Sequence, residues 1–192
     1  MTRSLGLAVC LALMVATGIA QVRPEEGGHE FQVWTGGGHS IPGGTKDIGV
    51  WNIGLRYGWI LTSPHGPGLL KGRFEYAVDA VPAFLFFQPH GTTYGAAINP
   101  LELKWIFATR NEVQPYLELG GGALFTSSEV PRGTSNVNFT PGAAFGVHFI
   151  GEKAWSVEVR YMHISNAGLT SPNPGINTIQ VRLGIGKFFQ RK

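Results

Sequence analysis

The sequence has only one cysteine, Cys10, and that residue lies in an apolar run at positions 5–16. A basic residue precedes the run, and glycine and alanine occupy the third and first positions before Gln21. This pattern is typical of a secretory signal peptide and is too short for a transmembrane anchor. We therefore expect residues 1–20 to be a signal peptide that directs export. The mature chain should then contain neither a disulfide nor a thiol nucleophile.

Long apolar runs are absent after residue 20, and charged residues make up only 14% of the chain. A membrane-spanning helix needs about 20 consecutive apolar residues, so none is expected. The formal net charge of +3 is small and the basic residues are scattered, which argues against a nucleic-acid partner. From its length, the segment of residues 21–192 is expected to form a single domain.

Paired metal ligands are also missing from the sequence. The six histidines are His29, His39, His65, His90, His148 and His163. Their spacing does not match a metal-binding motif, so we expect no metal and no cofactor. Most of these histidines are predicted to lie in loops.

Glycine and aromatic residues, in contrast, are abundant, with 28 Gly, 5 Trp, 5 Tyr and 12 Phe. Large apolar residues also recur at every second position, which is the period of a β-strand. In residues 51–59 the apolar face carries two tryptophans and a tyrosine, whereas Arg56 lies on the opposite face. A membrane β-barrel has its apolar face outward, against lipid, and its polar face inward.

About eight such segments, of roughly ten residues each, follow one another along the chain. They are residues 31–35, 51–59, 74–80, 101–107, 117–125, 137–149, 155–161 and 179–185. The inward charges are Arg56, Lys104, Arg160 and Arg182 against Glu75, Asp79, Glu102, Glu118 and Glu158. These nearly balanced charges predict a lumen filled by ion pairs rather than a channel. The predicted fold class is therefore all-β, an eight-stranded antiparallel transmembrane β-barrel located in the outer membrane.

Connections of alternating length support this topology. Long outer loops are predicted at residues 36–45, 88–93, 126–135 and 166–175, and short inner turns at 109–112 and 151–153. The inner connection at residues 61–72 is longer than usual for this fold. Pro82, Pro100 and Pro141 cannot donate a hydrogen bond to a strand ladder, so they predict strand ends or bulges.

Polar side chains continue the outward row of residues 155–161. The next two positions on that face are His163 and Ser165, about 7 Å apart at a strand rise of about 3.3 Å per residue. A histidine beside a serine hydroxyl is the base–nucleophile pair of an esterase. Across the hairpin, Asn177 could accept a hydrogen bond from the imidazole and fix its tautomer. Histidine and serine at a strand end are also common without catalysis, so both interpretations remain open.

The residues around this pair form a longer motif. The sequence RYMHISNAGL at residues 160–169, followed by NPGIN at 173–177, resembles the signature of the lipid A 3-O-deacylase family. Residues 95–107 are similar to the family's central strands, and the resemblance is strongest over residues 157–189. It implies an outer-membrane barrel that hydrolyses the ester-linked acyl chain at the 3-position of lipid A. Lipopolysaccharide and the surrounding membrane lipid are then the expected partners.

The resemblance also implies roles for individual residues. His163 would be the general base and Ser165 the nucleophile of a carboxylic ester hydrolase. Asn166 and the Gly168 N–H become candidates for stabilising the oxyanion. Asn177 stands where the family has a glutamate. Asparagine keeps a hydrogen-bond acceptor but lacks the charge that stabilises an imidazolium, so slower turnover, or none, is expected.

Two non-enzymatic alternatives fit parts of the sequence. A small outer-membrane barrel with a structural or surface-interaction role explains the strands and the signal peptide, but it leaves the His-x-Ser-Asn-Ala motif unexplained. A secreted soluble barrel with a ligand inside requires the apolar rows to point inward, which would place the charged rows on the outside.

Overall fold

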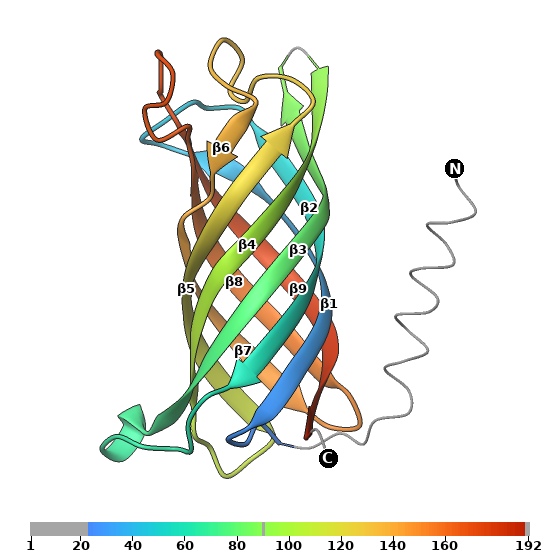
Figure 1. Ribbon diagram of the computed structural model, residues 1–192, viewed down its shortest axis with the longest axis vertical. Helices are drawn as coiled ribbons and strands as arrows, with labels where there is room; N and C mark the ends of the chain where they lie inside the picture. The colour runs from blue at the N-terminus through green and yellow to red at the C-terminus, as the bar shows by residue number, and fades with distance from the viewer. Residues whose placement is uncertain (1–22, 90, 191–192) are drawn as a thin grey trace, which may run out of the picture.

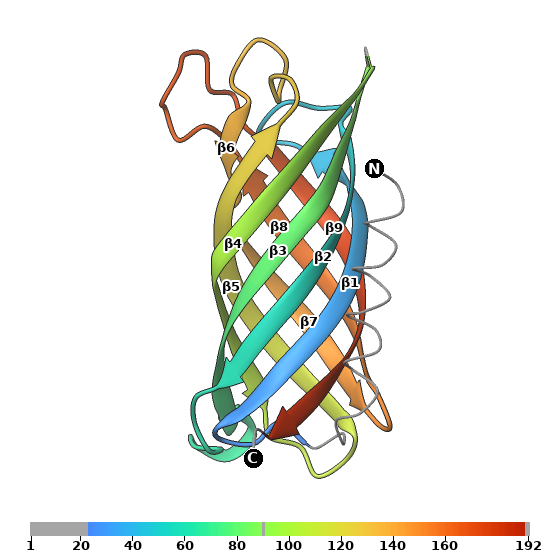
Figure 2. The same cartoon turned by 45° about the vertical axis from the view of Figure 1, so that its right-hand side comes forward.

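In a computed structural model, which describes residues 23–89 and 91–190, the chain forms a closed antiparallel β-barrel (Figures 1 and 2). Its strands are β1 (Gly28–Ile41), β2 (Gly49–Ile60), β3 (Gly72–Gln88), β4 (Gly91–Phe107), β5 (Val113–Thr126), β6 (Val137–Phe139), β7 (Gly142–Ile150), β8 (Ala154–Ile164) and β9 (Ile176–Gln190). The pairing of β4 with β5 and of β1 with β9 completes the ring. Both β6 and β7 pair with β5, so the nine segments act as eight barrel strands. The predicted eight-stranded barrel is confirmed.

The two ends of the barrel differ in their connections. The loop end carries residues 42–48, 127–136 and 165–175 and the hairpin between β3 and β4. The turn end carries residues 61–71, 108–112 and 151–153, together with the first and last described residues. The described part of the chain has no helix long and apolar enough to cross a membrane. The predicted signal peptide, Cys10 and His90 lie outside the described residues.

Successive side chains alternate between the lumen and the outer surface, as the strand period requires. The apolar rows point outward, and Phe145, Trp155 and Val181 are each more than half exposed. The charged rows point inward, where Arg56 and Lys104 are buried. The predicted faces are therefore confirmed, and a soluble barrel with inward apolar rows is excluded.

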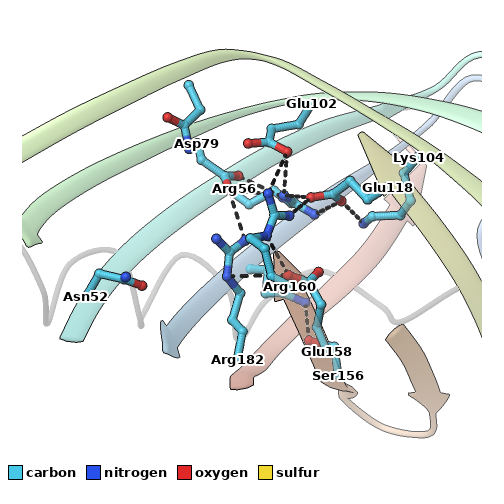
Figure 3. Close-up of polar contacts among 12 residues, drawn as sticks. Asn52, Arg56, Asp79, Glu102, Lys104, Glu118, Ser156, Glu158, Arg160 and Arg182 are labelled. Carbon is cyan, nitrogen blue, oxygen red and sulfur yellow. Dashed lines mark hydrogen bonds and ion pairs between the residues drawn. The ribbon is translucent and has the colours of Figure 1, made fainter. Parts of the chain in front are cut away.

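A network of ion pairs fills the middle of the lumen (Figure 3). Arg56 Nε lies 2.7 Å from Asp79 Oδ1, and its Nη1 lies 2.5 Å from Glu118 Oε2. Arg160 contacts the same Glu118 carboxylate from the other side of the lumen. Such mutual pairing is required because an isolated buried charge costs several kcal/mol.

The network also contains a carboxylate that the sequence pattern did not reveal. Lys104 Nζ lies 2.7 Å from Glu30 Oε2 and 3.2 Å from Glu75 Oε1. Glu30 belongs to β1, which begins at Gly28 rather than at residue 31. The first strand was predicted too short because the outward residue before Phe31 is the polar His29, so the apolar row begins only at residue 31.

Apolar clusters close the lumen above and below these charges. The cluster towards the loop end consists of Trp34, Ile48, Val50, Val81, Phe84, Phe86, Leu124, Val130, Met162, Ile164 and Ile176. The cluster towards the turn end consists of Ile60, Ile106, Tyr116, Ile150, Ala154 and Phe188. The described lumen is thus a packed core with a charged middle layer.

The three strand prolines mark irregularities, as predicted. The β3–β4 register shifts between Val81 and Phe84, next to Pro82. The β4–β5 register shifts around Pro100. Pro141 separates β6 from β7. These breaks occur where proline leaves a ladder position without a donor.

Two predicted loops and the histidine placement were wrong in part. Residues 36–41 belong to β1, since this glycine-rich stretch pairs with both β2 and β9 although it lacks side-chain alternation. The predicted loop at residues 88–93 is mostly strand, because β3 and β4 extend into a tight hairpin. His29 and His39 lie in β1 rather than in loops, whereas His148 and His163 lie in strands, as the alternating rows that contain them predict. His148 points into the lumen, where it is fully buried.

Candidate active site

His163 and Asn177 lie on the outward face at the loop end, where β8 and β9 stop pairing, and the largely buried Ser165 and Asn166 follow directly in the chain. His163 is the register partner of Asn177, and the last pair of this ladder is Ile164 with Ile176. Beyond this pair the chain turns away from β9. Ser165 then forms an isolated antiparallel bridge with Phe139 of β6.

The break between β6 and β7 allows this change of partner. Phe139 N donates to Ser165 O over 2.7 Å, and Ser165 N donates to Phe139 O over 3.2 Å. His163 N donates to Pro141 O over 2.9 Å, although Pro141 itself has no N–H to return. Backbone hydrogen bonds to Phe139 and Pro141 therefore fix the positions of both His163 and Ser165.

A short hydrogen bond joins the side chains of His163 and Asn177 across the β8–β9 hairpin. His163 Nδ1 lies 2.6 Å from Asn177 Oδ1, and the Tyr161 hydroxyl donates to the same oxygen over 2.9 Å. Because an amide oxygen only accepts, the Nδ1 atom must carry the proton. The lone pair of the neutral imidazole then lies on Nε2, which is the atom a general base uses.

Glycines hold the loops against these two side chains. A Cβ atom on Gly175 would lie 2.8 Å from His163 Cε1, and a Cβ atom on Gly43 would lie 2.8 Å from Asn177 Nδ2. Both glycines have positive φ angles, 65° and 103°. Thr45 N donates to Gly175 O over 2.9 Å, which ties the β1–β2 loop to the β8–β9 loop. The backbone of Gly175 therefore lies close against one side of the imidazole.

Ser165 lies beside this pair but is not hydrogen-bonded to it. Ser165 as a whole residue is 8% exposed. Among the described residues, His163 Nδ1 bonds only to Asn177, and no hydrogen bond links the Ser165 hydroxyl to the imidazole. The structure therefore brings Asn177 to His163 and leaves the serine hydroxyl unengaged with the base.

The two oxyanion candidates lie in the loop that follows Ser165. Gly168 N donates to Asn166 Oδ1 over 2.9 Å, and Asn166 N donates to Asn173 Oδ1 over 3.2 Å. The Asn166 amide group donates to Thr170 Oγ1 over 2.7 Å. Both backbone N–H groups are accordingly paired with side-chain oxygens in this conformation.

Sequence reasoning missed three residues that organise the site: Tyr161, Thr170 and Asn173. Tyr161 was assigned to the apolar row because its ring shares that row's parity. Asn173 lies in the NPGIN motif, but the motif alone does not show that its side chain accepts a hydrogen bond from Asn166 N. The hydroxyl of Tyr161 could have revealed this role, since an outward tyrosine close to Asn177 can donate a hydrogen bond to the amide oxygen.

Fold and site together define a membrane β-barrel that presents a histidine-centred polar group on its outward face. Residues 86–186 match the family model described as Lipid A 3-O-deacylase (PagL). The chain is 34% identical over 177 residues to the Lipid A deacylase PagL of Bordetella bronchiseptica, covering 90% of this chain and 89% of that protein. The chain therefore belongs to the lipid A 3-O-deacylase (PagL) family, and its place is the outer membrane.

Solved structures agree with this fold. The crystal structure of the outer membrane enzyme PagL aligns with a TM-score of 0.63 at 22% sequence identity, covering 80% of this chain and 97% of that one. The outer membrane protein OprG from Pseudomonas aeruginosa aligns with a TM-score of 0.55 at 13% identity, covering 87% and 98%. At these identities the two structures support the barrel fold alone.

Proposed function

We propose that this chain is a lipid A 3-O-deacylase, an outer-membrane hydrolase that removes the ester-linked acyl chain at the 3-position of lipid A. The observation that carries the proposal is the His163–Asn177 hydrogen bond on the outward face, two residues before Ser165 in the chain. Family membership supports the substrate class, since the curated relative is named a lipid A deacylase.

The position of the site fits a membrane lipid as substrate. Barrels of this kind have short periplasmic turns and longer extracellular loops, so the loop end would face the cell exterior. Residues 1–20, as a signal peptide, would direct the chain to this membrane. The site would then lie in the outer leaflet, near the depth of lipid ester bonds. The substrate would approach sideways, with its acyl chain along the outward apolar rows.

In the proposed reaction, the Ser165 hydroxyl oxygen attacks the ester carbonyl carbon while His163 Nε2 accepts the hydroxyl proton. The tetrahedral intermediate collapses, and the sugar 3-hydroxyl leaves with the proton that His163 had taken. Water then attacks the acyl-enzyme with His163 again as base, which releases the fatty acid and restores Ser165. Catalytic hydrogen bonds of free enzymes are often long and tighten only when substrate binds, which fits the present separation of Ser165 from the imidazole.

Oxyanion stabilisation requires donors at the end of β8. The N–H groups of Asn166 and Gly168 are the candidates, and each now donates to a side-chain amide oxygen. An oxyanion would replace a neutral acceptor with a charged one, and hydrogen bonds to charged acceptors are stronger. We therefore propose that Asn173 and Asn166 release these N–H groups when the intermediate forms.

Asn177 is proposed to orient the imidazole without supplying charge. An amide in this place can select the wrong tautomer if its NH2 group turns towards the histidine, at a cost of about 10⁴ in turnover. The Tyr161 hydroxyl opposes that rotation, because it donates to the oxygen that faces His163. Tyr161 is accordingly proposed as a positioning residue.

The proposal is tested with purified protein and lipid A in detergent, using mass spectrometry to detect loss of the 3-O-linked acyl chain. Ser165→Ala and His163→Ala should each abolish the loss and leave a folded barrel. Ser63→Ala is the matched control, since Ser63 is exposed at the turn end, and it should retain activity. A wild-type protein that releases no acyl chain from lipid A would contradict the proposal.

A non-catalytic barrel is the second candidate function. It is favoured by one observation, the lack of a hydrogen bond between Ser165 and His163 within the described residues. In that case the wild type and both variants would show the same absence of hydrolysis, and the role would be structural or a surface interaction.

A further inference from the structure

The connection between β2 and β3 is the longest at the turn end. Residues 61–71 contain the short 3-10 helix η1 (Gly68–Leu70), whereas the other two connections are the simple turns at 108–112 and 151–153. Figure 1 shows this segment extending sideways beyond the barrel wall, at the lower left. It does not fold back under the lumen.

Contacts with Trp105 place the segment on the lipid-facing side of the wall. Trp105 points outward from β4, between the buried Lys104 and Ile106. Its indole Nε1 donates to Leu70 O over 3.2 Å. The His65 ring packs edge-on against the same indole, with centroids 5.0 Å apart. A segment held by an outward-facing tryptophan lies beside the barrel at the height of that tryptophan.

That height corresponds to the membrane–water interface. Aromatic side chains surround Trp105 on the outer surface, with Phe74 at a centroid distance of 5.9 Å. On the next two strands, Tyr76 of β3 stacks on Trp59 of β2, with ring centroids 5.5 Å apart. Girdles of aromatic residues mark the two interfaces of outer-membrane barrels. The segment is therefore placed where acyl chains meet headgroups.

The side chains at its tip suit this place, and the part of the chain that the structure describes leaves them exposed. Leu69 is 96% exposed and Leu70 is 63% exposed, and η1 contains no buried residue. Lys71 follows directly and is exposed. Two adjacent leucines with a following lysine match an interfacial anchor, in which apolar groups enter the acyl region and a cation remains at the phosphates.

We propose that residues 66–71 form a membrane foot, in which Leu69 and Leu70 insert into the phospholipid leaflet at the turn end and Lys71 contacts its phosphate groups. The occupant of this surface is lipid because the foot is continuous with the lipid-facing surface of β4. This role is independent of the proposed chemistry at Ser165. It fixes the depth of one side of the barrel, opposite in height to the candidate active site.

Site-directed spin labelling tests the foot directly. The sequence has a single cysteine, so Cys10→Ser gives a background for Leu69→Cys. Two matched positions calibrate the measurement: Val181→Cys on the outward wall and Glu152→Cys in the exposed β7–β8 turn. In phospholipid bilayers, a label in lipid collides more with oxygen, and a label in water collides more with a nickel chelate.

The label at Leu69 should resemble Val181 in its preference for oxygen. A label that follows Glu152 would overturn the proposal, because the foot would then be in water. A label shielded from both reagents would also overturn it, because the tip would then be packed against protein. In bilayers with anionic headgroups, Lys71→Glu should increase nickel collisions at position 69. An unchanged value would remove the phosphate contact from the proposal.

Discussion

His163 Nδ1 and Asn177 Oδ1 lie 2.6 Å apart, at the next-to-last residue pair of the β8–β9 ladder. The acceptor is a neutral amide, at the position where the sequence resemblance implies a glutamate in the family. The hydrogen bond therefore orients the imidazole but adds no negative charge to stabilise it when it becomes protonated. Each proposed catalytic step depends on how well this arrangement substitutes for an ion pair.

Restoring the charge should raise the activity. Asn177→Asp keeps the size of the side chain, and Asn177→Glu introduces the residue that the resemblance implies for this position. Either carboxylate would stabilise the imidazolium formed when Ser165 loses its proton, and a gain of about 1.4 kcal/mol corresponds to roughly tenfold in rate. The measurement is the initial rate of acyl release from lipid A. Little change for both variants would mean that Asn177 acts only by its shape.

Removing the Tyr161 hydroxyl should lower turnover through the orientation of Asn177. Tyr161→Phe deletes one hydrogen bond of about 1 kcal/mol, so kcat should fall roughly fivefold while KM stays similar. The ¹⁵N chemical shifts of the His163 ring should show a larger fraction of the wrong tautomer.

The matched background for this test is Asn177→Asp. A carboxylate presents an oxygen to His163 in either orientation, so the loss caused by Tyr161→Phe should be smaller there. An equal loss in both backgrounds would show that the hydroxyl acts elsewhere than on Asn177.

Gly175→Ala should impair catalysis beyond its effect on stability. The added Cβ would lie 2.8 Å from His163 Cε1, so the imidazole must move away from Asn177. Gly133→Ala is the control, because Gly133 also has a positive φ but its Cβ would meet nothing within 4 Å. Both variants carry a backbone strain of about 1–2 kcal/mol. Thermal unfolding should therefore change alike, and only Gly175→Ala should lose activity.

A charged side chain on the outward wall should destabilise the folded barrel more, the deeper it lies in the bilayer. Val181 is 51% exposed on the middle of β9, whereas Val113 is outward at the first position of β5. Val181→Arg should lower the free energy of unfolding by about 2–4 kcal/mol, and Val113→Arg by about 0–1 kcal/mol. Equilibrium unfolding in lipid vesicles measures both. Similar costs at the two positions would contradict the assignment of Val181 to the membrane interior.

The barrel was predictable from sequence because its main signal is local. Alternation in residues 51–59 and 155–161 already assigns Arg56 and Arg160 to the lumen, and the same parity places His163 and Asn177 on the outward face. Glycine-rich stretches such as residues 36–41 carry no such signal, so their strand character appears only when both neighbouring strands are present.

The remaining details of the site depend on contacts between distant residues. The bridge between Ser165 and Phe139 exists because Pro141 interrupts a different strand. The engagement of the Asn166 N–H by Asn173 follows from the folded path of one loop. Neither can be derived from residue types and spacing, because register and loop closure are set by pairing partners that the local pattern does not specify.

The packed lumen has a consequence for the membrane around it. Ion pairs such as Arg56–Asp79 occupy the middle of the barrel, and apolar clusters seal it towards both ends. Within residues 23–89 and 91–190, these layers interrupt an aqueous path for ions and small solutes along the axis. Large numbers of copies in a bilayer should therefore add no measurable electrical conductance, and the cell can express this barrel without loss of its permeability barrier.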